Sequence, residues 1–461
     1  MFEAKIYQSR RKTLRQKIDN GILLLPGNNE SAMNYSANTY HYRQDSNFLY
    51  FFGIDSPGMG GICDIDKDHD IVYGDDLGID DIIWMGEQEK ISSRAKNAGV
   101  KIVKAYADLE KDLLEAIKEG RRIHILPPYR GDTKIELKNL LSCSVDEVNG
   151  FVSEEFIKAV VSLREIKDDF EIAEIEFAVD IAYKMHTTAM KMAFPGTWER
   201  EIAGMVEGVS LANGGAVSFP VILSMDGQTL HNHHHGNLLE KDRLMITDAG
   251  SESPLHYASD ITRTTPVGGK FNPRQKEIYE IVLKANMEAI KESKPGVLNR
   301  EVHFVAAKII AKGLKDLGIM KGDVDEAVKA GAHALFFPHG LGHMMGLDVH
   351  DMEGLGEDNV GYDEKLKRSS QFGTAYLRMG KELKPGMVMT IEPGLYFIPA
   401  LIDLWKSEGK CTDFINYDKV ESYKDFGGVR IEDDILITQD GCRVLGTPIP
   451  KTVKEIEDLM C

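Results

Sequence analysis

Acidic side chains recur at the ends of apolar, strand-like segments in the C-terminal half of the chain. Leu244–Asp248 is an apolar run that ends in a carboxylate, and Asp260–Thr265 begins the next run after a connection that contains Gly250 and Pro254. A long hairpin of this kind can bring two aspartates onto one face. An aspartate at a strand end is ordinarily a turn residue, but recurrence of the pattern favours a chemical role.

Two further carboxylates lie in apolar runs near the C-terminus. Met387–Gly394 carries Glu392 in a strand before a turn, and Val429–Ile437 places Arg430 and Glu432 on one face of another strand. Carboxylates buried in apolar strands are costly unless positive charge compensates them. A pair of divalent metal ions is the natural compensator, and such a pair needs further ligands.

Histidines that could complete a metal site lie between these acidic segments. His339 and His343 belong to a glycine-rich, tightly turned segment, and His350 follows it. One imidazole and four carboxylates, some of them bridging, can hold two ions in the geometry of two-metal hydrolases, which activates a water and polarises a carbonyl. The oxygen-rich ligand set favours a hard cation such as Mn²⁺, and ligand type alone leaves zinc, cobalt and iron open.

Composition excludes several classes of partner. The 461 residues include 55 Lys plus Arg and 73 Asp plus Glu, which gives a formal net charge of −18. Such a chain repels phosphate backbones and anionic membranes, and no basic run exceeds Arg10–Lys12, so we expect neither a nucleic-acid nor a membrane partner. No apolar run approaches the about 20 residues of a membrane span, and no signal-peptide core follows the N-terminus. Five cysteines without a CxxC pair fit a reducing compartment, so we expect a soluble cytoplasmic protein.

Helix-like and strand-like segments alternate over residues 1–165, which predicts an α/β domain. The expected helices are Arg10–Ile18 and Asp108–Lys118, and the expected strands are Gly21–Gly27, Phe48–Gly53, Asp70–Tyr73 and Ile123–Pro128. A charged stretch at Arg164–Asp169 is the expected linker. A second domain then covers residues 166–461.

This second domain contains an apparent internal duplication. One helix is expected to begin at Asp168 or Asp169 and another at Asn272, and both end at a Pro-Gly pair. The segments that follow, Pro195–Ile202 and Pro295–Val302, share their Pro-Gly start and an Arg-Glu pair. Because each is followed by another helix and then by strands, we infer a pseudo-two-fold sheet with helices outside and a cleft between the halves.

The acidic and histidine motifs, in this order, resemble those of the pita-bread metallopeptidases, and within that group those of proline-specific aminopeptidase P and prolidase. The segments that carry the resemblance are Asp248, Asp260–Thr264, His339–Asp351, Thr390–Tyr396 and Gly427–Asp434. Arg43–Tyr50 also resembles a signature of the N-terminal domain that these enzymes share with creatinase. The resemblance covers essentially the whole chain. It implies an α/β (α+β) protein, with a pseudo-symmetric pita-bread catalytic domain after a smaller creatinase/aminopeptidase P-type α/β domain.

The resemblance also implies a site for two divalent ions, with Mn²⁺ expected. The implied metal ligands are Asp248, Asp260, His343, Glu392 and Glu432, and Asp260 and Glu432 would bridge both ions. The implied catalytic residues are His231, His339, His350, Glu392 and Arg430. The three histidines would contact substrate or stabilise the tetrahedral intermediate, since imidazole donates hydrogen bonds near pH 7. Arg430 would orient nearby carboxylates, and Glu392 would also carry a proton.

Two features depart from the family pattern. Asp248 and Asp260 are twelve residues apart, whereas the family usually has eleven. We place the extra residue in the Ser251–Ser259 connection, where a longer turn costs little, because inside a strand it would turn Asp260 to the opposite face. The run His231–His235 is richer in histidine than the family needs. A solvated loop at the cleft mouth is the favoured interpretation, and an additional metal site is the alternative.

The expected reaction is metal-dependent hydrolysis of the peptide bond between an N-terminal residue and proline. The long connection between Tyr396 and Phe426 resembles the prolidase type more than the short aminopeptidase P type, which favours dipeptides and leaves longer peptides open. A metal-free creatinase-like amidinohydrolase and a non-catalytic pita-bread binding module are the alternatives, although all five ligand positions are compatible with metal. The resemblance further implies a homodimer or homotetramer.

Overall fold

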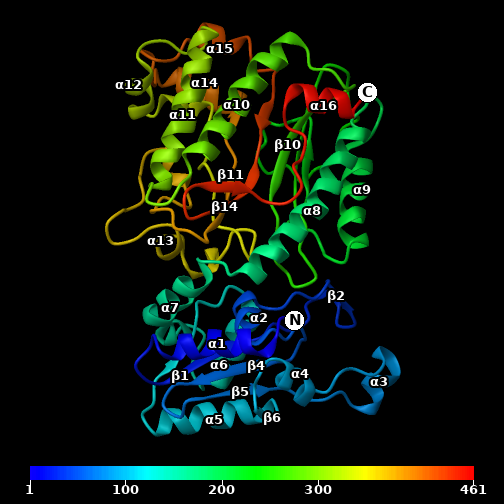
Figure 1. The fold of residues 1–461 in the computed structure, drawn as a ribbon, viewed down its shortest axis with the longest axis vertical. Helices are drawn as coiled ribbons and strands as arrows, with labels where there is room; N and C mark the ends of the chain where they lie inside the picture. Colours follow the sequence, from blue (N-terminus) through cyan, green and yellow to red (C-terminus); the bar gives the residue numbers. More distant parts are fainter. The chain divides into compact units, whose positions relative to one another are not determined.

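The computed structural model describes residues 1–461, and contacts divide the chain into two compact units (Figure 1). Unit 1 comprises residues 1–164 and 353–359, and unit 2 comprises residues 165–352 and 360–461. Both units mix helices and strands, so the predicted α/β class is confirmed. None of the helices combines the length and the apolar character that crossing a membrane requires.

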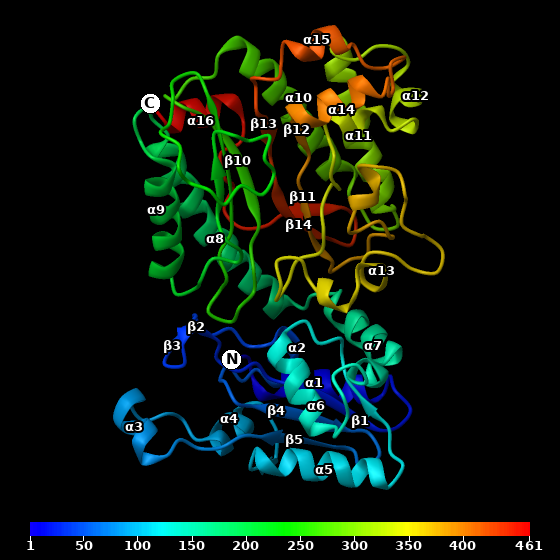
Figure 2. The ribbon, with the colours of Figure 1, turned by 180° about the vertical axis from the view of Figure 1, so that it is seen from behind.

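Unit 1 is built on a five-stranded mixed sheet in the order β6-β5-β4-β1-β7 (Figure 2). Its strands are β1 (Ile22–Pro26), β4 (Gly60–Asp64), β5 (His69–Tyr73), β6 (Ile102–Lys104) and β7 (Ile123–His124). Strand β1 pairs antiparallel with β4 and parallel with β7, while β5 pairs parallel with β6. A separate hairpin joins β2 (Ala32–Tyr35) to β3 (Asn38–Thr39).

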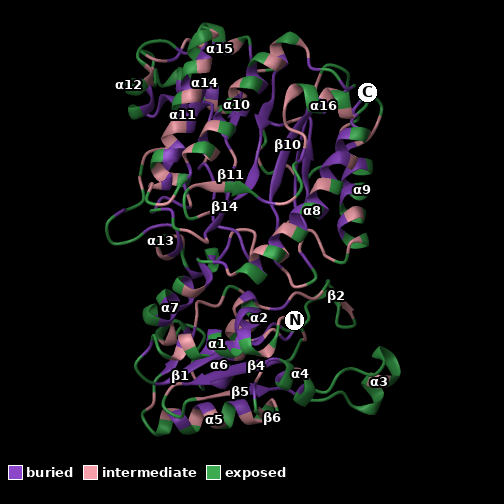
Figure 3. Ribbon diagram, in the orientation of Figure 1, coloured by how far each residue is buried: buried purple, intermediate pink, exposed green.

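Unit 1 also contains seven helices and a 3₁₀ turn, most of which pack around this sheet. They are α1 (Ala4–Arg15), α2 (Ser46–Phe52), α3 (Ile79–Met85), α4 (Ile91–Asn97), α5 (Ala107–Lys118), α6 (Gly131–Leu140), the 3₁₀ turn η1 (Val148–Phe151) and α7 (Glu154–Arg164). The core of one face packs Leu24 and Ile62 of the sheet against Leu109 and Leu113 of α5 and Leu137 of α6. Figure 3 shows the central strands β1 and β4 of this sheet as largely buried. The first and fifth helices confirm the two predicted ones, although α1 begins earlier than expected.

The predicted strand at Phe48–Gly53 is wrong, because these residues form helix α2. The Asp45 side chain caps that helix by accepting hydrogen bonds from the backbone N–H groups of Asn47 and Phe48, each at 2.9 Å. Gly53 ends the helix in the left-handed region, at φ 63°. A short apolar run that is buried does not by itself distinguish strand from helix, and the aspartate cap was the available signal.

Unit 2 repeats one arrangement of helices and strands. The first half contains α8 (Asp169–Met192), α9 (Glu199–Ala212), β8 (Ile222–Ser224), β9 (Leu244–Ala249) and β10 (Ile261–Pro266). The second half contains α10 (Pro273–Glu292), α11 (Asn299–Asp316), β11 (Val388–Ile391), β12 (Gly394–Tyr396), β13 (Gly428–Arg430), β14 (Asp433–Ile437) and β15 (Cys442–Val444). Within unit 2 the paired helices flank the strands on opposite sides (Figure 1). Asp168 and Asn272 cap α8 and α10, as predicted.

Shorter helices complete the chain. They are α12 (Val324–Lys329), η2 (Ala332–Leu335), η3 (Glu353–Leu355), α13 (Glu357–Val360), η4 (Thr374–Tyr376), α14 (Pro399–Ser407), α15 (Tyr417–Glu421) and α16 (Val453–Leu459). Two of them, α14 and α15, lie in the long connection between β12 and β13 that the sequence analysis singled out.

The two Pro-Gly exits make equivalent hydrogen bonds. The Gly196 N–H donates to the Leu239 carbonyl at 2.9 Å, and the Gly296 N–H donates to the Leu383 carbonyl at 2.9 Å. Both glycines have positive φ, 91° and 83°, which explains why glycine occupies each position. The matched geometry confirms the predicted duplication and its pseudo-two-fold arrangement.

Buried histidines of unit 2 should make the stability of the protein sensitive to acid. Burial lowers the pKa of His186 and of His303 to about 3, and that of His333 to about 4. These histidines stay neutral in the folded state but gain protons near pH 6.5 in the unfolded chain. The free energy of unfolding should therefore fall as the pH decreases from about 6.5 to about 4, by about 1.4 kcal/mol per pH unit for each such histidine.

Urea unfolding at several pH values, with a chelator present throughout, measures this slope. His303→Phe should reduce the slope because it removes one buried titrating ring and keeps an aromatic side chain beside Phe337, whose ring centroid lies 5.2 Å away. His234→Ala is the matched control, because His234 is exposed. If His303→Phe and His234→Ala change the pH dependence of the free energy of unfolding equally, the prediction is wrong.

Candidate metal centre

The first pair of carboxylates lies on the antiparallel hairpin of β9 and β10. The register sets Asp248 opposite Thr262. The same register continues into the connection, where Glu252 bridges Ala258. Asp260, two residues before Thr262, therefore lies on the same face as Asp248. The pairs Asp248–Thr262 and Glu252–Ala258 share one register, so no extra residue is inserted between them. The additional residue of the connection therefore lies in the turn between Glu252 and Ala258.

The second pair lies between strands of the C-terminal half. Thr390 of β11 pairs with Asp434 of β14, and the hydrogen bond from Ile431 N to the Pro393 carbonyl carries the same register toward β12 and β13. Glu392 and Glu432 stand opposite one another in this register, in the short gaps between strands. The expectation that they lie inside regular strands is thus wrong, because each chain leaves one ladder and enters the next at that point.

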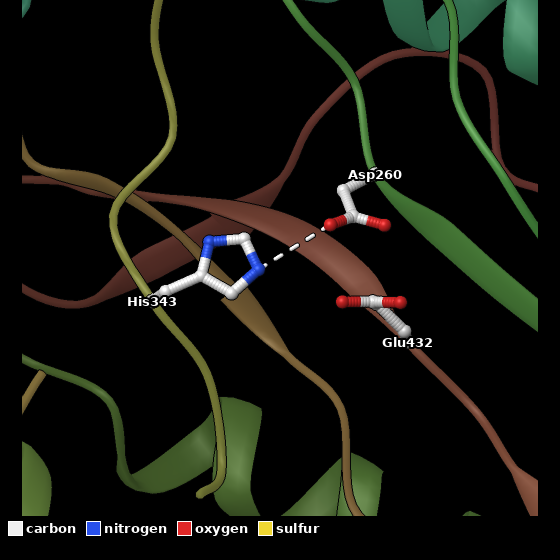
Figure 4. A group of neighbouring side chains, drawn as sticks. All are labelled: Asp260, His343 and Glu432. Atoms are coloured by element: carbon white, nitrogen blue, oxygen red, sulfur yellow. Dashed lines mark ion pairs between the residues drawn. The ribbon is translucent and has the colours of Figure 1, made fainter. Parts of the chain in front are cut away.

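Three side chains form the centre of the site. Ligand atoms of Asp260, His343 and Glu432 lie within 4.8 Å of one another, and all three residues are buried (Figure 4). His343 Nε2 lies 3.3 Å from Asp260 Oδ2. The other ring nitrogen, Nδ1, lies 3.0 Å from the Met344 carbonyl, which fixes the ring with Nε2 toward the carboxylates.

The outer carboxylates have their own partners. Arg430 Nη2 donates to Asp248 Oδ2 at 2.6 Å, and Arg430 Nη1 donates to the Tyr396 hydroxyl at 2.8 Å. Glu392 Oε2 lies 3.8 Å from His339 Nδ1. Asp248 and Glu392 line the same cavity as the three central residues. The structure thus brings together all five predicted ligands and Arg430.

Electrostatics in the site fit bound cations. Burial, together with the neighbouring carboxylates, raises the pKa of Asp260 and of Glu432 well above the ordinary values. Burial also raises the pKa of Glu392 to about 7, although Arg430 opposes the shift. The Oδ1 atoms of Asp248 and Asp260 are buried and have no hydrogen-bond partner. Four clustered carboxylates, two of them with an unpartnered buried oxygen, beside an imidazole are a donor set that suits two divalent cations.

Three predicted catalytic histidines line the same cavity as the carboxylates. The His350 ring packs edge-on against His343, with 4.1 Å between ring centroids. His339 Nε2 lies 3.0 Å from the Tyr396 hydroxyl. Burial and the nearby Arg430 lower the pKa of His339 to about 3 and also lower the pKa of His231, so both rings favour the neutral form.

The cavity has a volume of about 980 Å³ and a largely apolar wall. The apolar lining residues are Phe219, Pro220, Ile222, Leu230, Pro338, Val349, Phe372, Tyr376, Ile398, Ala400, Leu401 and Leu404. Some of them belong to α14, so the long connection contributes to the wall. His233 also lines the cavity and is exposed, which agrees with a solvated loop at its mouth.

Sequence reasoning missed two polar residues of the site. Arg378 is a second guanidinium in the cavity lining, and no motif surrounds it in the sequence. The Tyr396 hydroxyl joins Arg430 to His339. The sequence could have placed Tyr396 in the site, because it follows Glu392 by four residues, a spacing that keeps both side chains on one face of an extended chain.

Two family models match this chain. Residues 173–439 match the model of metallopeptidase family M24, and residues 7–125 match the model of the aminopeptidase P N-terminal domain. The first match spans more than half of the sequence. The chain belongs to metallopeptidase family M24.

Relatives of this M24 metallopeptidase cover nearly its full length. It is 32% identical over 450 residues to the Xaa-Pro dipeptidase of Homo sapiens, and the aligned region covers 95% of this chain and 88% of that relative. It is 33% identical over 452 residues to a probable Xaa-Pro aminopeptidase of Aspergillus clavatus, with 95% and 92% covered. Escherichia coli aminopeptidase P, solved with the inhibitor Pro-Leu, superimposes with a TM-score of 0.81 at 29% identity and covers 100% of this chain and 98% of that one. These likenesses confirm the predicted family and the pita-bread fold.

Proposed function

We infer that this M24 metallopeptidase hydrolyses the bond between an N-terminal residue and proline, with divalent cations bound. The observation that carries this function is the buried cluster of Asp260, His343 and Glu432 in a cavity of about 980 Å³. The relatives named Xaa-Pro dipeptidase and Xaa-Pro aminopeptidase supply the reaction. The complete ligand set argues against a metal-free creatinase-like enzyme and against a non-catalytic binding module.

The cations would be held by five side chains, namely Asp248, Asp260, His343, Glu392 and Glu432. Asp260 and Glu432 are the proposed bridging ligands, since both belong to the central cluster. Bound cations polarise a carbonyl and lower the pKa of a water molecule. Mn²⁺ is the proposed metal because oxygen ligands dominate, although a related Escherichia coli aminopeptidase P has been solved in a zinc-substituted form.

Glu392 is the proposed proton carrier. Burial raises the pKa of Glu392 to about 7 when no cation is bound, and a cation beside it would lower this pKa. The ionised carboxylate would then accept a proton from water and pass it on. A proton taken at Glu392 Oε would pass to the proline nitrogen as the peptide bond breaks. His339 Nδ1 lies 3.8 Å from Glu392 Oε2 and hydrogen-bonds instead to the Gly340 carbonyl at 2.8 Å.

The surrounding rings and Arg430 orient the substrate and the ligands. His231 and His350 line the cavity and would donate hydrogen bonds to substrate oxygens. His339 lines it too, but its Nδ1 donates to the Gly340 carbonyl at 2.8 Å, so this ring would act by packing and through Tyr396. Arg430 holds Asp248 at 2.6 Å, which fixes one carboxylate without occupying its second oxygen. Tyr396 couples Arg430 to His339 through its hydroxyl.

Substrate chemistry fits this cavity. The clustered carboxylates attract a free N-terminal ammonium, and the apolar wall accepts a rigid pyrrolidine ring. The amide before proline has no N–H, so recognition of that bond must use its carbonyl oxygen and the ring. N-terminal amines and proline at the second position are therefore the proposed recognition elements.

Substrate length separates dipeptidase from aminopeptidase activity. We expect dipeptides to be preferred, because the long connection that contains α14 forms part of the cavity wall and Arg378 places a guanidinium in the same lining, where a substrate carboxylate could reach it. A series of Ala-Pro, Ala-Pro-Ala and longer peptides measures kcat/KM against length. Arg378→Met should weaken hydrolysis of Ala-Pro but not of Ala-Pro amide, which lacks the carboxylate. Faster hydrolysis of tripeptides than of dipeptides would contradict this expectation and favour an aminopeptidase.

The remaining proposals concern organisation and location. We propose an N-terminal aminopeptidase P-type domain at residues 1–165 and a catalytic domain at residues 166–461. All five cysteines are free thiols, which supports a cytoplasmic location. A homodimer or homotetramer is the proposed assembly, and light scattering after gel filtration measures its mass.

A further inference from the structure

A buried polar network lies behind the candidate metal ligands. Arg263 follows Thr262 in β10, so its side chain points away from the face that carries Asp260. Its guanidinium is almost fully buried and donates to the carbonyl of Glu432 at 2.7 Å and to that of Thr262 at 3.0 Å. Arg263 thereby joins β10, which follows Asp260, to the segment between β13 and β14 that carries Glu432.

The C-terminal segment reaches into this network. Arg263 also donates to the carbonyls of Ile449 and Pro450, at 3.1 and 3.0 Å. Lys451 then donates from Nζ to Asp433 Oδ2 at 2.6 Å, while Arg263 binds the other oxygen of that carboxylate at 2.7 Å. Asp433 is thus held from both sides.

A second branch of the network runs through helix α10. Lys451 Nζ donates to Asn286 Oδ1 at 2.9 Å. Asn286 Nδ2 in turn donates to the carbonyl of Ile391 at 3.0 Å and lies 3.4 Å from that of Ile431. These two carbonyls immediately precede Glu392 and Glu432 in the chain.

Both branches therefore end on backbone next to metal ligands. We propose that Lys451 is a positioning residue for the divalent-cation site, and that Ile449–Lys451 is a strap that fixes the ligand-bearing segments relative to one another. Lys451 does not line the cavity, so it acts through Asp433 and Asn286. The proposal rests on the proposed function only in assigning the cations to this ligand cluster.

Metal affinity of the full-length protein tests the proposal without any substrate. Lys451→Met keeps the length of the stem but removes the ammonium, so we expect Mn²⁺ to bind about 10–100-fold more weakly in calorimetric titration. Lys451→Arg should restore most of the affinity, because it returns a cation. Lys454→Met is the matched control, since Lys454 is exposed and its recorded ion pair is with Asp458 on the same helix.

The stabilisation that Mn²⁺ confers distinguishes positioning from a merely structural role. A weaker Kd reduces the rise in unfolding temperature at a given Mn²⁺ concentration. We expect Lys451→Met to shrink this rise, while Lys454→Met leaves it unchanged. If Lys451→Met does not fold, Lys451→Gln, which keeps a donor, takes its place. The proposal would be overturned if the Lys451→Met variant showed the same Mn²⁺ affinity and the same Mn²⁺-induced stabilisation as the unmodified protein. This outcome can be read whether or not the protein has Xaa-Pro activity.

Discussion

Replacing His343 with alanine should abolish most Xaa-Pro hydrolysis and leave a folded protein. His343 is the one imidazole in the central cluster, with Nε2 3.3 Å from Asp260 Oδ2. Losing a direct ligand should cost more than the about 10–100-fold that loss of an outer hydrogen-bond partner costs. Glu432→Ala should have a similar effect, since Glu432 is one of the two proposed bridging carboxylates. The measurement is kcat/KM on Ala-Pro at saturating Mn²⁺.

Exposed histidines supply the controls for this experiment. His234→Ala should leave kcat/KM unchanged, because His234 is exposed and does not line the cavity. His233→Ala should have little effect, although His233 lies at the cavity lining. The unfolding temperature of each variant in chelator shows whether the fold persists. Equal losses of activity in His233→Ala and His343→Ala would refute the assignment of the histidines.

Removing divalent ions should eliminate activity, and Mn²⁺ should restore it. Without cations, four carboxylates cluster in one cavity, where Arg430 pairs directly with Asp248 and two buried carboxylate oxygens have no hydrogen-bond partner. We therefore expect chelation to lower the unfolding temperature as well as the rate. Elemental analysis of the reloaded protein should give two ions per chain. Full activity in chelator, together with no bound metal, would rule out this site.

Apolar segments of the sequence singled out the four carboxylates and a glycine-rich segment held His343, while the family resemblance supplied their assignment as metal ligands, which remains a proposal. Strand register then explains why they meet, since Asp248 pairs with Thr262, and Glu392 stands opposite Glu432 between two ladders that share one register. The error at Phe48–Gly53 has a local cause, because the apolar run hid a capped helix.

The strap behind the site had no such signal. Asn286, Asp433 and Lys451 are ordinary polar residues in the sequence, and only the tertiary fold brings them together. Arg378 is similar, since its role depends on a cavity whose walls come from distant segments. Sequence patterns report neighbours along the chain, whereas the contact between Lys451 and Asn286 joins positions 165 residues apart.

The comparison of Ala-Pro with Ala-Ala tests the proposed function most directly. On the Mn²⁺-loaded protein, kcat/KM for Ala-Pro should far exceed that for Ala-Ala, and N-acetyl-Ala-Pro should not be cleaved, because its blocked amine no longer carries the charge that the carboxylates attract. Hydrolysis of Ala-Pro should also stop in chelator. Equal rates on Ala-Pro and Ala-Ala would contradict the account and indicate a general aminopeptidase on the same fold.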